Sequence, residues 1–378
     1  MKIAVLALTG GGADTALRLV EKLPGSELNG GRPGAYRSPR VREVKVFLPQ
    51  KLGADSPDGE LYAGSPSGLM GDIFHRFDGF VLIMAAGVAV RVMAPLLQGK
   101  DRDPAVVLLD EKGRFAVSLL SGHLGGANDL ARSVAAVLGG TPVITTSTDV
   151  QGRLAVDVLA RDLGAKIEPV EGIVRVNSAL ARGEKITLLS EGVLPLGEDY
   201  PLWNDPCWEV VTAVGNLFEA ARELGDTGKP LVVLTSKTGP AGFLYLRPPS
   251  LVAGVGCRRG TTAAAISEAL EAALAQSGRS MLSLKKISSI GEKSAEEGIL
   301  SAAETLGLET EFYPAGLLAS ILSEHPGLAR SEFVSKQMGV GGVCEPASLA
   351  GCRQGRLILG KQARQGVTVA LAEEESGW

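Results

Sequence analysis

The feature that most constrains the fold is a recurring local order. A short apolar run is followed by a glycine-rich segment and then by apolar residues at helical spacing. This order follows residues 2–8, 80–84 and 115–120, and it returns after residues 251–255. Continuous apolar runs are typical of buried strands, and their alternation with helices indicates an α/β sheet. We therefore predict an α/β protein built on open, largely parallel sheets.

Three regions follow from where this pattern stops and resumes. Residues 1–150 are expected to form an N-terminal domain with an open sheet, mixed because residues 105–120 read as a hairpin. The pattern changes from residue 151, so residues 151–248 are expected to form a small middle α/β domain. It restarts near residue 249, and residues 249–378 are expected to form a compact C-terminal α/β domain.

The composition argues against several classes of protein. A net charge of −4 without a basic stripe speaks against nucleic-acid binding. Four cysteines without C-x-x-C spacing are typical of free thiols in a cytoplasmic protein, and no metal site is expected. No stretch approaches 18 consecutive apolar residues, so no membrane span is expected. Residues 24–43 and 51–72, rich in Gly, Pro, Ser and charge, are expected to be surface loops.

The first candidate site is the loop S-G-H-L-G-G-A-N-D, residues 121–129. It follows a predicted strand and precedes a helix whose expected N-cap is Asn128. His123 has an ordinary pKa near 6.5, which suits proton transfer at neutral pH. Three glycines would let a ligand approach the main chain: Gly122, Gly125 and Gly126. The alternative is a histidine that satisfies backbone carbonyls in a tight turn.

The second candidate site is G-V-G-C-R-R-G, residues 254–260, again between a strand and a helix. It fails as a dinucleotide fingerprint because Arg259 stands where the third glycine would be. Arg258 and Arg259 suit carboxylates, which arginine binds in a bidentate way, although they could equally be a solvated pair. Cys257 is either a reactive thiol at a helix N-terminus or a small buried residue.

Two further motifs carry weaker signals. T-G-G-G-A-D, residues 9–14, is expected to be a turn that packs a helix closely on a strand. In V-C-E-P-A-S, Pro346 marks the start of a helix, which would place Glu345 near its cap. His75 and His325 are expected to be structural or solvated.

Several long motifs resemble the CbiG family. F-D-G-F-V-L-I-M-A-A-G-V-A-V-R-V-M-A-P-L-L, D-P-A-V-V-L-L-D-E and S-L-L-S-G-H-L-G-G-A-N are similar to its N-terminal region. G-V-G-C-R-R-G-T-T, S-E-F-V, V-C-E-P-A and K-Q-A-R-Q-G-V-T-V-A-L-A are similar to its C-terminal domain, which also resembles CobE. One departure is S-I-G-E-K-S-A-E, where Lys293 and Glu296 fit the family's T-I-D-x-K-x-x-E but Gly291 replaces the aspartate.

The resemblance implies a cobalt-precorrin-5A hydrolase of anaerobic cobalamin biosynthesis. Such an enzyme opens a δ-lactone on a cobalt-bound macrocycle, in ring A, and releases the methylated bridging carbon as acetaldehyde, giving cobalt-precorrin-5B. The reaction consumes water and needs no cofactor, since the substrate carries the cobalt. The partners implied are this small-molecule corrinoid, a second copy of the chain in a homodimer, and transiently the neighbouring pathway enzymes.

Site roles are hypotheses that combine the motifs above with what lactone hydrolysis requires, a base for water and donors for the oxyanion. His123 would act as base, directly or through water, and backbone N–H groups around residues 125–128 would stabilise the oxyanion. Asn128 and Glu345 complete the predicted catalytic set, and Arg91 joins the arginine pair in clamping carboxylates. The predicted substrate-binding residues are Gly87, Arg91, Gly122, Gly125, Gly126, Gly256, Cys257, Arg258, Arg259, Gly260, Thr261, Lys293, Glu296 and Lys361.

Two alternatives compete with this interpretation. The similarity to CobE motivates a non-catalytic protein that binds corrinoid intermediates and hands them on. The three glycine loops motivate a nucleotide-dependent α/β enzyme.

Overall fold

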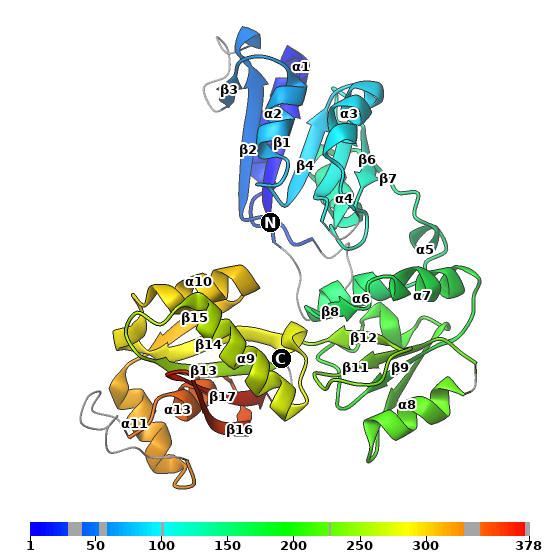
Figure 1. Ribbon diagram of the computed structural model, residues 1–378. Coiled ribbons are helices and arrows are strands. Elements are labelled where there is room, and N and C mark those ends of the chain that lie inside the picture. Colours follow the sequence, from blue (N-terminus) through cyan, green and yellow to red (C-terminus); the bar gives the residue numbers. More distant parts are fainter. Residues whose placement is uncertain (29–39, 53–58, 100–101, 227, 329–340, 375–378) are drawn as a thin grey trace. The chain divides into compact units, whose positions relative to one another are not determined.

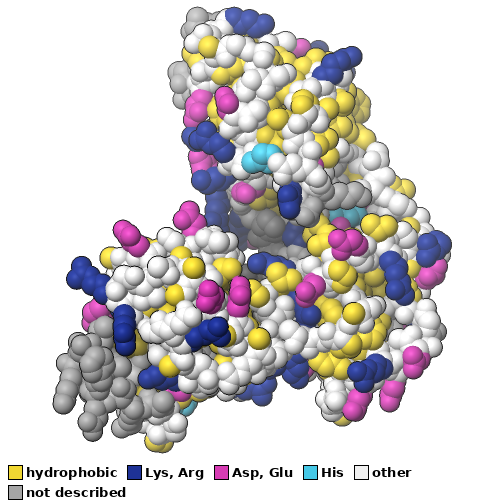
Figure 2. All heavy atoms as spheres, viewed as in Figure 1, with side chains coloured by type: hydrophobic (Ala, Val, Ile, Leu, Met, Phe, Trp, Pro, Cys, Tyr) yellow, Lys and Arg dark blue, Asp and Glu magenta, His cyan; other side chains and the backbone are white. Residues whose placement is uncertain are grey.

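Three β-sheets with packed helices make up the computed structural model, which confirms the predicted α/β class (Figure 1). The structure describes residues 1–28, 40–52, 59–99, 102–226, 228–328 and 341–374. Contacts divide the chain into two compact units. The first unit comprises Met1–Leu163, Val170–Ile186 and Leu196–Glu209; the second comprises Gly164–Pro169, Thr187–Pro195 and Val210–Trp378. On the face shown in Figure 2, acidic and basic side chains are interspersed over each unit.

The first unit contains a seven-stranded open sheet with the order β3-β2-β1-β4-β5-β6-β7. Its strands are β1 (Lys2–Ala7), β2 (Glu43–Pro49), β3 (Glu60–Tyr62), β4 (Gly79–Ile83), β5 (Ala105–Leu109), β6 (Phe115–Leu120) and β7 (Thr141–Val143). All neighbours are parallel except β5 and β6, whose antiparallel register pairs Leu108 with Val117. This pairing confirms the predicted hairpin and the mixed sheet.

Helices cover both faces of this sheet. They are α1 (Gly10–Lys22), α2 (Pro66–Ile73), α3 (Ala86–Met93) and α4 (Ala127–Leu138). The first unit also contains α5 (Ser147–Val150), α6 (Val156–Leu163) and α7 (Gly172–Ala181). Ile3 and Val5 pack with α1 and α4, whereas Ala4 and Leu6 pack with α2 and α3. Burial of both faces explains why β1 reads as a continuous apolar run.

The prediction that residues 51–72 form a loop is wrong in part, because β3 and most of α2 lie there. Within this range, Ser65 and Pro66 form the start of a helix. Ser65 Oγ accepts the Gly68 N–H at 3.2 Å, and Pro66 occupies the first helical position. Residues 29–39 and 53–58 of the two expected loops lie outside the described residues.

The middle region forms a five-stranded sheet with the order β10-β9-β11-β12-β8. Its elements are β8 (Lys166–Glu168), β9 (Ile186–Ser190), β10 (Trp208–Thr212), α8 (Leu217–Gly225), β11 (Leu231–Leu234) and β12 (Leu244–Arg247). Strands β9, β11 and β12 are parallel, so the loops after β9 and β11 meet at one edge. Arg247 ends β12, so residues 248–250 connect this sheet to the next one.

The C-terminal sheet has the order β15-β14-β13-β17-β16. Its elements are β13 (Leu251–Cys257), α9 (Ala263–Ser277), β14 (Leu284–Ile290), α10 (Glu297–Leu306), β15 (Glu309–Tyr313), α11 (Ala315–Glu324), α13 (Cys344–Ala350), β16 (Gly355–Arg364) and β17 (Val367–Glu374). Helices α9 and α10 share one core, whereas α11 and α13 share another. Strands β13 and β14 are parallel, so the segments that follow them meet at one sheet edge.

Candidate functional site

The loop around His123 is held by its own side chains and by α5 and α6. Helix α4 begins at Ala127, and its N-cap is Gly126 at φ +88°, so the prediction of Asn128 as N-cap is wrong. The Asn128 side chain instead accepts from Ser118 Oγ at 2.7 Å and donates to Asp149 Oδ2 at 2.9 Å. Asn128 therefore fixes the loop from within the first turn of α4.

The His123 imidazole lies between two carboxylates. Nε2 is 2.8 Å from Asp149 Oδ2, Nδ1 is 3.2 Å from Asp157 Oδ2, and the side chain is only 13 % exposed. Burial would lower the pKa of His123, but the hydrogen bonds and charges of both aspartates outweigh it and raise the pKa to about 9. The ring is thus an imidazolium at neutral pH, and both of its N–H groups are engaged.

This arrangement corrects the expected role of His123 as a general base. An imidazolium has no lone pair with which to take a proton from water. The ring instead holds the loop against the first residues of α6 and against α5. The role that the geometry supports is positioning.

Two arginines complete the ionic network around this ring. Arg132 pairs with Asp149 at 2.7 Å and with Asp129 at 2.9 Å. Arg161 also pairs with Asp129 and donates to the His123 carbonyl at 2.9 Å. These groups are not among the predicted site residues, although Asp157 and Arg161 have the i, i+4 spacing of a charge pair on one helix face.

The glycines of the loop serve its own packing. A Cβ at Gly122 would lie 2.7 Å from Asn128 Oδ1, and one at Gly125 would lie 2.5 Å from Ser121 Cβ. The N–H groups of Gly126, Ala127 and Asn128 donate to the carbonyls of His123, Ser121 and Gly122. The expectation that these three N–H groups face an oxyanion is therefore not supported, because each closes the loop.

The predicted residues after β13 and β14 do come together. Glu296 accepts the Gly260 N–H at 2.7 Å and pairs with Lys293 Nζ at 3.0 Å, although both side chains are about nine-tenths buried. The Lys293 ammonium holds the pKa of Glu296 below its ordinary value. Thr261 Oγ1 donates to the Arg258 carbonyl at 2.8 Å. Buried charges at the carboxyl ends of parallel strands are a typical ligand-binding arrangement.

Gly256, Cys257 and Arg258 precede the Gly260 turn that Glu296 holds. Cys257 is half-buried, and this burial raises the pKa of its thiol, which argues against a reactive thiolate. The Arg258 side chain packs against Gly366, in the turn between β16 and β17. A Cβ at Gly256 would lie 2.7 Å from Thr368 Oγ1, so this glycine serves strand packing.

A hydrogen bond joins the Glu345 side chain to the main chain of Lys361. Helix α13 contains Pro346 in its first turn, as expected, and buries Glu345. Glu345 Oε1 accepts the Lys361 backbone N–H at 2.8 Å, which ties α13 to β16. The expected motif S-E-F-V, residues 331–334, lies outside the described residues.

Gly87 and Arg91 lie on α3, at the carboxyl end of β4. Arg91 Nη1 donates to the Gly87 carbonyl at 2.9 Å, and a Cβ at residue 87 would lie 3.1 Å from that nitrogen. Beside this turn is a cavity of about 570 Å³ that the sequence analysis did not foresee. It is lined by Leu8, Thr9, Ile83, Met84, Ala85, Ala86, Val88, Leu108, Leu109, Asp110, Glu111, Phe115 and Val117.

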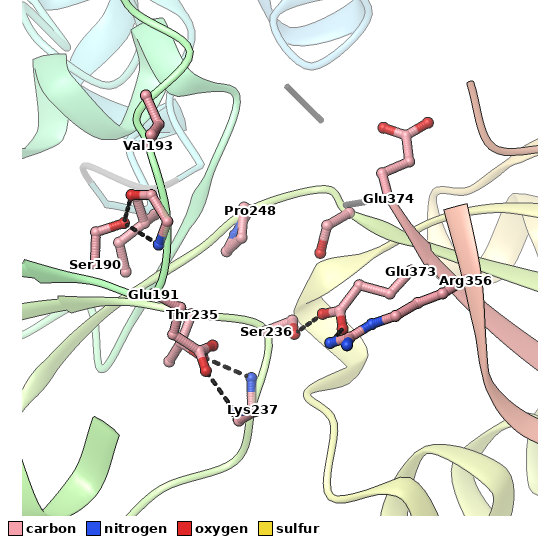
Figure 3. Close-up of a pocket in the computed structure, with 13 residues that line it drawn as sticks. Ser190, Glu191, Val193, Thr235, Ser236, Lys237, Pro248, Arg356, Glu373 and Glu374 are labelled. Atoms are coloured by element: carbon pink, nitrogen blue, oxygen red, sulfur yellow. Dashed lines mark hydrogen bonds and ion pairs between the residues drawn. The ribbon is translucent and has the colours of Figure 1, made fainter. Parts of the chain in front are cut away.

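A second cavity, of about 320 Å³, lies in the second unit where the loops after β9 and β11 face β16 and β17. Figure 3 shows Ser236 and Arg356 both reaching Glu373, while Lys237 pairs with Glu191. Because its carboxylates already have cationic or hydroxyl partners, this cavity is a polar seam that joins the middle sheet to the C-terminal sheet.

Comparison with known proteins identifies the family. Three family models match: "Cobalamin synthesis G N-terminal" at residues 68–149, "Cobalamin biosynthesis central region" at 154–248 and "Cobalamin synthesis G C-terminus" at 251–372. A cobalt-precorrin-5A hydrolase of Salmonella typhimurium is 33 % identical over 383 residues, covering 98 % of this chain and 97 % of the relative. The chain belongs to the CbiG family.

Other relatives cover most or part of the chain. A cobalt-precorrin-5A hydrolase of Priestia megaterium is 35 % identical and covers 83 % of each chain. CobE of Sinorhizobium sp. is 36 % identical over 124 residues, covering 32 % of this chain and 79 % of CobE. A solved cobalamin biosynthesis protein G homolog from Sulfolobus solfataricus is 21 % identical with a TM-score of 0.37, covering 99 % of this chain and 97 % of that one. Among the described helices, none is long and apolar enough to cross a membrane.

Proposed function

We propose that this chain hydrolyses cobalt-precorrin-5A and releases acetaldehyde, giving cobalt-precorrin-5B. The observation that carries the proposal is the 33–35 % identity, over 83–98 % of the chain, to relatives named cobalt-precorrin-5A hydrolase. The three matched family models, which together span residues 68–372 with short gaps, support the same assignment.

In the proposed reaction, water adds to the lactone carbonyl and the ester bond breaks. The products are a carboxylate on ring A and an alcohol on the methylated bridging carbon. The alcohol then loses its proton as the carbon–carbon bond to the macrocycle breaks, which releases acetaldehyde. The macrocycle takes the electron pair and a proton, so the sum consumes one water and no redox cofactor. Cobalt enters and leaves with the substrate.

The chain's residues take the following proposed parts. Arg258 and Arg259 bind substrate carboxylates beside the Lys293–Glu296 pair, whose buried charges hold the Gly260 turn in place. His123 is a positioning residue, because its ring is charged and engaged on both nitrogens.

The test is anaerobic incubation of the full chain with cobalt-precorrin-5A and an assay for acetaldehyde. Release at a rate that scales with the amount of protein is expected, and binding without release would overturn the proposal. With His123→Ala, a reduced rate is expected. Unchanged release from this variant would remove His123 from the mechanism.

A second candidate is a non-catalytic protein that binds and hands on corrinoid intermediates. The observation that favours it is the 36 % identity to CobE over 124 residues. In the same incubation, this function gives a shifted corrinoid absorption spectrum without acetaldehyde.

Further proposals concern organisation and setting. We propose three domains, residues 1–150, 151–248 and 249–378, and the limits of the three family models support these boundaries. We also propose a cytoplasmic homodimer that contacts neighbouring pathway enzymes transiently. Sedimentation of the purified chain tests the dimer.

A further inference from the structure

The cavity beside α3 lies next to β1, where the order in which strands are added to the N-terminal sheet reverses. From β1 the chain runs through α1 to β2 on one side, and it later returns to β4 on the other side of β1. The residues after β1 and after β4 diverge there, and both segments line the cavity. In open α/β sheets, ligands bind in the crevice at such a switch point.

The wall of this cavity is mainly apolar. Leu8, Ile83, Met84, Val88 and Val117 line it, together with Phe115, whose side chain is 49 % exposed. A volume of about 570 Å³ falls within the range typical of small-molecule sites. Phe115 is continuous with the other apolar residues of the lining, and contiguous exposed apolar surface is typical of ligand-binding grooves.

The two acidic residues of the lining are engaged in holding the fold. Glu111 accepts from Thr9 Oγ1 at 3.0 Å, which places its carboxylate over the first turn of α1. Asp110 accepts the Phe115 N–H at 2.8 Å and pairs with Arg114 at 3.2 Å. Arg114 partly offsets the charge of Asp110, and the Glu111 carboxylate is directed to Thr9, so the surface left for a ligand is mainly the apolar wall.

A cation stands beside the same wall. Arg91 is folded back onto the first turn of α3 by its bond to the Gly87 carbonyl, next to the lining residues Ala86 and Val88. This bond engages one of the five N–H groups of the guanidinium. Arg91 therefore lies next to the apolar cavity without lining it, and its guanidinium can bind a carboxylate.

We propose that this cavity receives the apolar edge of the corrinoid macrocycle and that Arg91 binds a carboxylate on its periphery. The inference rests on the proposed function, which supplies a substrate that is both apolar in its ring and anionic at its rim. A corrinoid is larger than the cavity, so one edge enters. A nucleotide or a sugar would leave polar groups unpaired against this wall.

The test measures binding of cobyrinic acid, a cobalt corrinoid with free peripheral carboxylates, to the full chain by calorimetry. Ala86→Trp fills the cavity from an exposed position, so the variant is expected to fold and to bind roughly tenfold more weakly. Val90→Trp is the matched control, because Val90 lies on the same helix, is half exposed and does not line the cavity. It is expected to bind as the wild type does.

A second pair of variants tests the charge. Arg91→Gln is expected to weaken binding about fivefold at low salt and less at high salt, whereas Arg76→Gln, an exposed arginine after α2, is expected to change nothing. Wild-type affinity in both folded Ala86→Trp and folded Arg91→Gln overturns the inference, as does a wild type that fails to bind cobyrinic acid.

The outcome is separable from that of the proposed function. If the wild type releases acetaldehyde and KM is unchanged in Ala86→Trp and Arg91→Gln, the cavity is not the substrate site, and the proposed hydrolysis is still supported. A wild type that binds cobyrinic acid through the cavity but releases no acetaldehyde supports the cavity and overturns the hydrolysis.

Discussion

His123 Nε2 lies 2.8 Å from Asp149 Oδ2, and the opposite ring nitrogen faces Asp157 at 3.2 Å. A buried imidazolium between two carboxylates stabilises the fold only while it is charged. The loop that looked like a site of proton transfer is therefore a structural joint between β6, α5 and α6.

The stability of the first unit should fall in alkaline solution. The pKa of His123 is raised from about 6.5 when unfolded to about 9 when folded, so the folded state binds the extra proton between these values. The stabilisation is complete below pH 6.5 and is lost as the pH rises through about 9. At about 1.4 kcal/mol per pKa unit, the loss is about 3 kcal/mol. Urea unfolding between pH 6 and 10 measures it.

His325→Gln is the control for this experiment, because His325 is an exposed residue after α11. It should keep the wild-type pH profile, whereas His123→Gln should be less stable at pH 7 and should lose most of the slope between pH 7 and 9. A wild-type profile that is flat over this range would contradict the charged joint.

Glu296→Gln should weaken the turn after β13. In the wild type, the Glu296 carboxylate pairs with the buried Lys293 and accepts the Gly260 N–H. The amide removes this negative charge, so a loss of about 1–2 kcal/mol of unfolding free energy is expected. Glu297→Gln, at the exposed neighbouring position, should leave stability unchanged. Chemical denaturation of the two variants decides, and equal curves would mean that the pair contributes nothing.

Glu373→Ala should destabilise the second unit. Glu373 pairs with Arg279 at 2.9 Å, and the Arg279 side chain is only 11 % exposed, so the change leaves a buried cation without that carboxylate. A cost of about 3 kcal/mol is expected. Glu184→Ala, which breaks an exposed pair with Arg182, should have almost no effect. If thermal unfolding shows a lower melting temperature for Glu184→Ala than for Glu373→Ala, Glu373 does not stabilise the second unit as proposed.

Gly254→Ala should separate α13 from β13. A Cβ at this position would lie 1.8 Å from the Cys344 carbonyl oxygen, which belongs to the backbone of the helix and cannot rotate away. A loss of about 3 kcal/mol or more is expected. Gly316→Ala is the control, because a Cβ there would meet nothing within 4 Å and the position is helical. Its melting temperature should equal or exceed that of the wild type.

The local elements could be predicted from the sequence because their signals are local. The apolar run at residues 2–8 predicts a strand and forms β1 (Lys2–Ala7), and two apolar runs around a turn predict the hairpin of β5 and β6. The segment with β3 and α2 was not, since Ser, Pro and Gly favour both turns and helix starts.

The role of each candidate residue depends on contacts with parts of the chain that are distant in sequence. The sequence by itself determined that a glycine-rich loop beginning near residue 121 joins a strand to a helix. Only the tertiary structure decided that His123 is charged, because Asp149 and Asp157 come from two later helices that nothing in the loop reveals. The cavity beside Arg91 is non-local in the same way, since β1, β4 and the β5–β6 hairpin each supply part of its wall. A pKa depends on which charges folding brings within a few ångströms, and a cavity on which strands become neighbours.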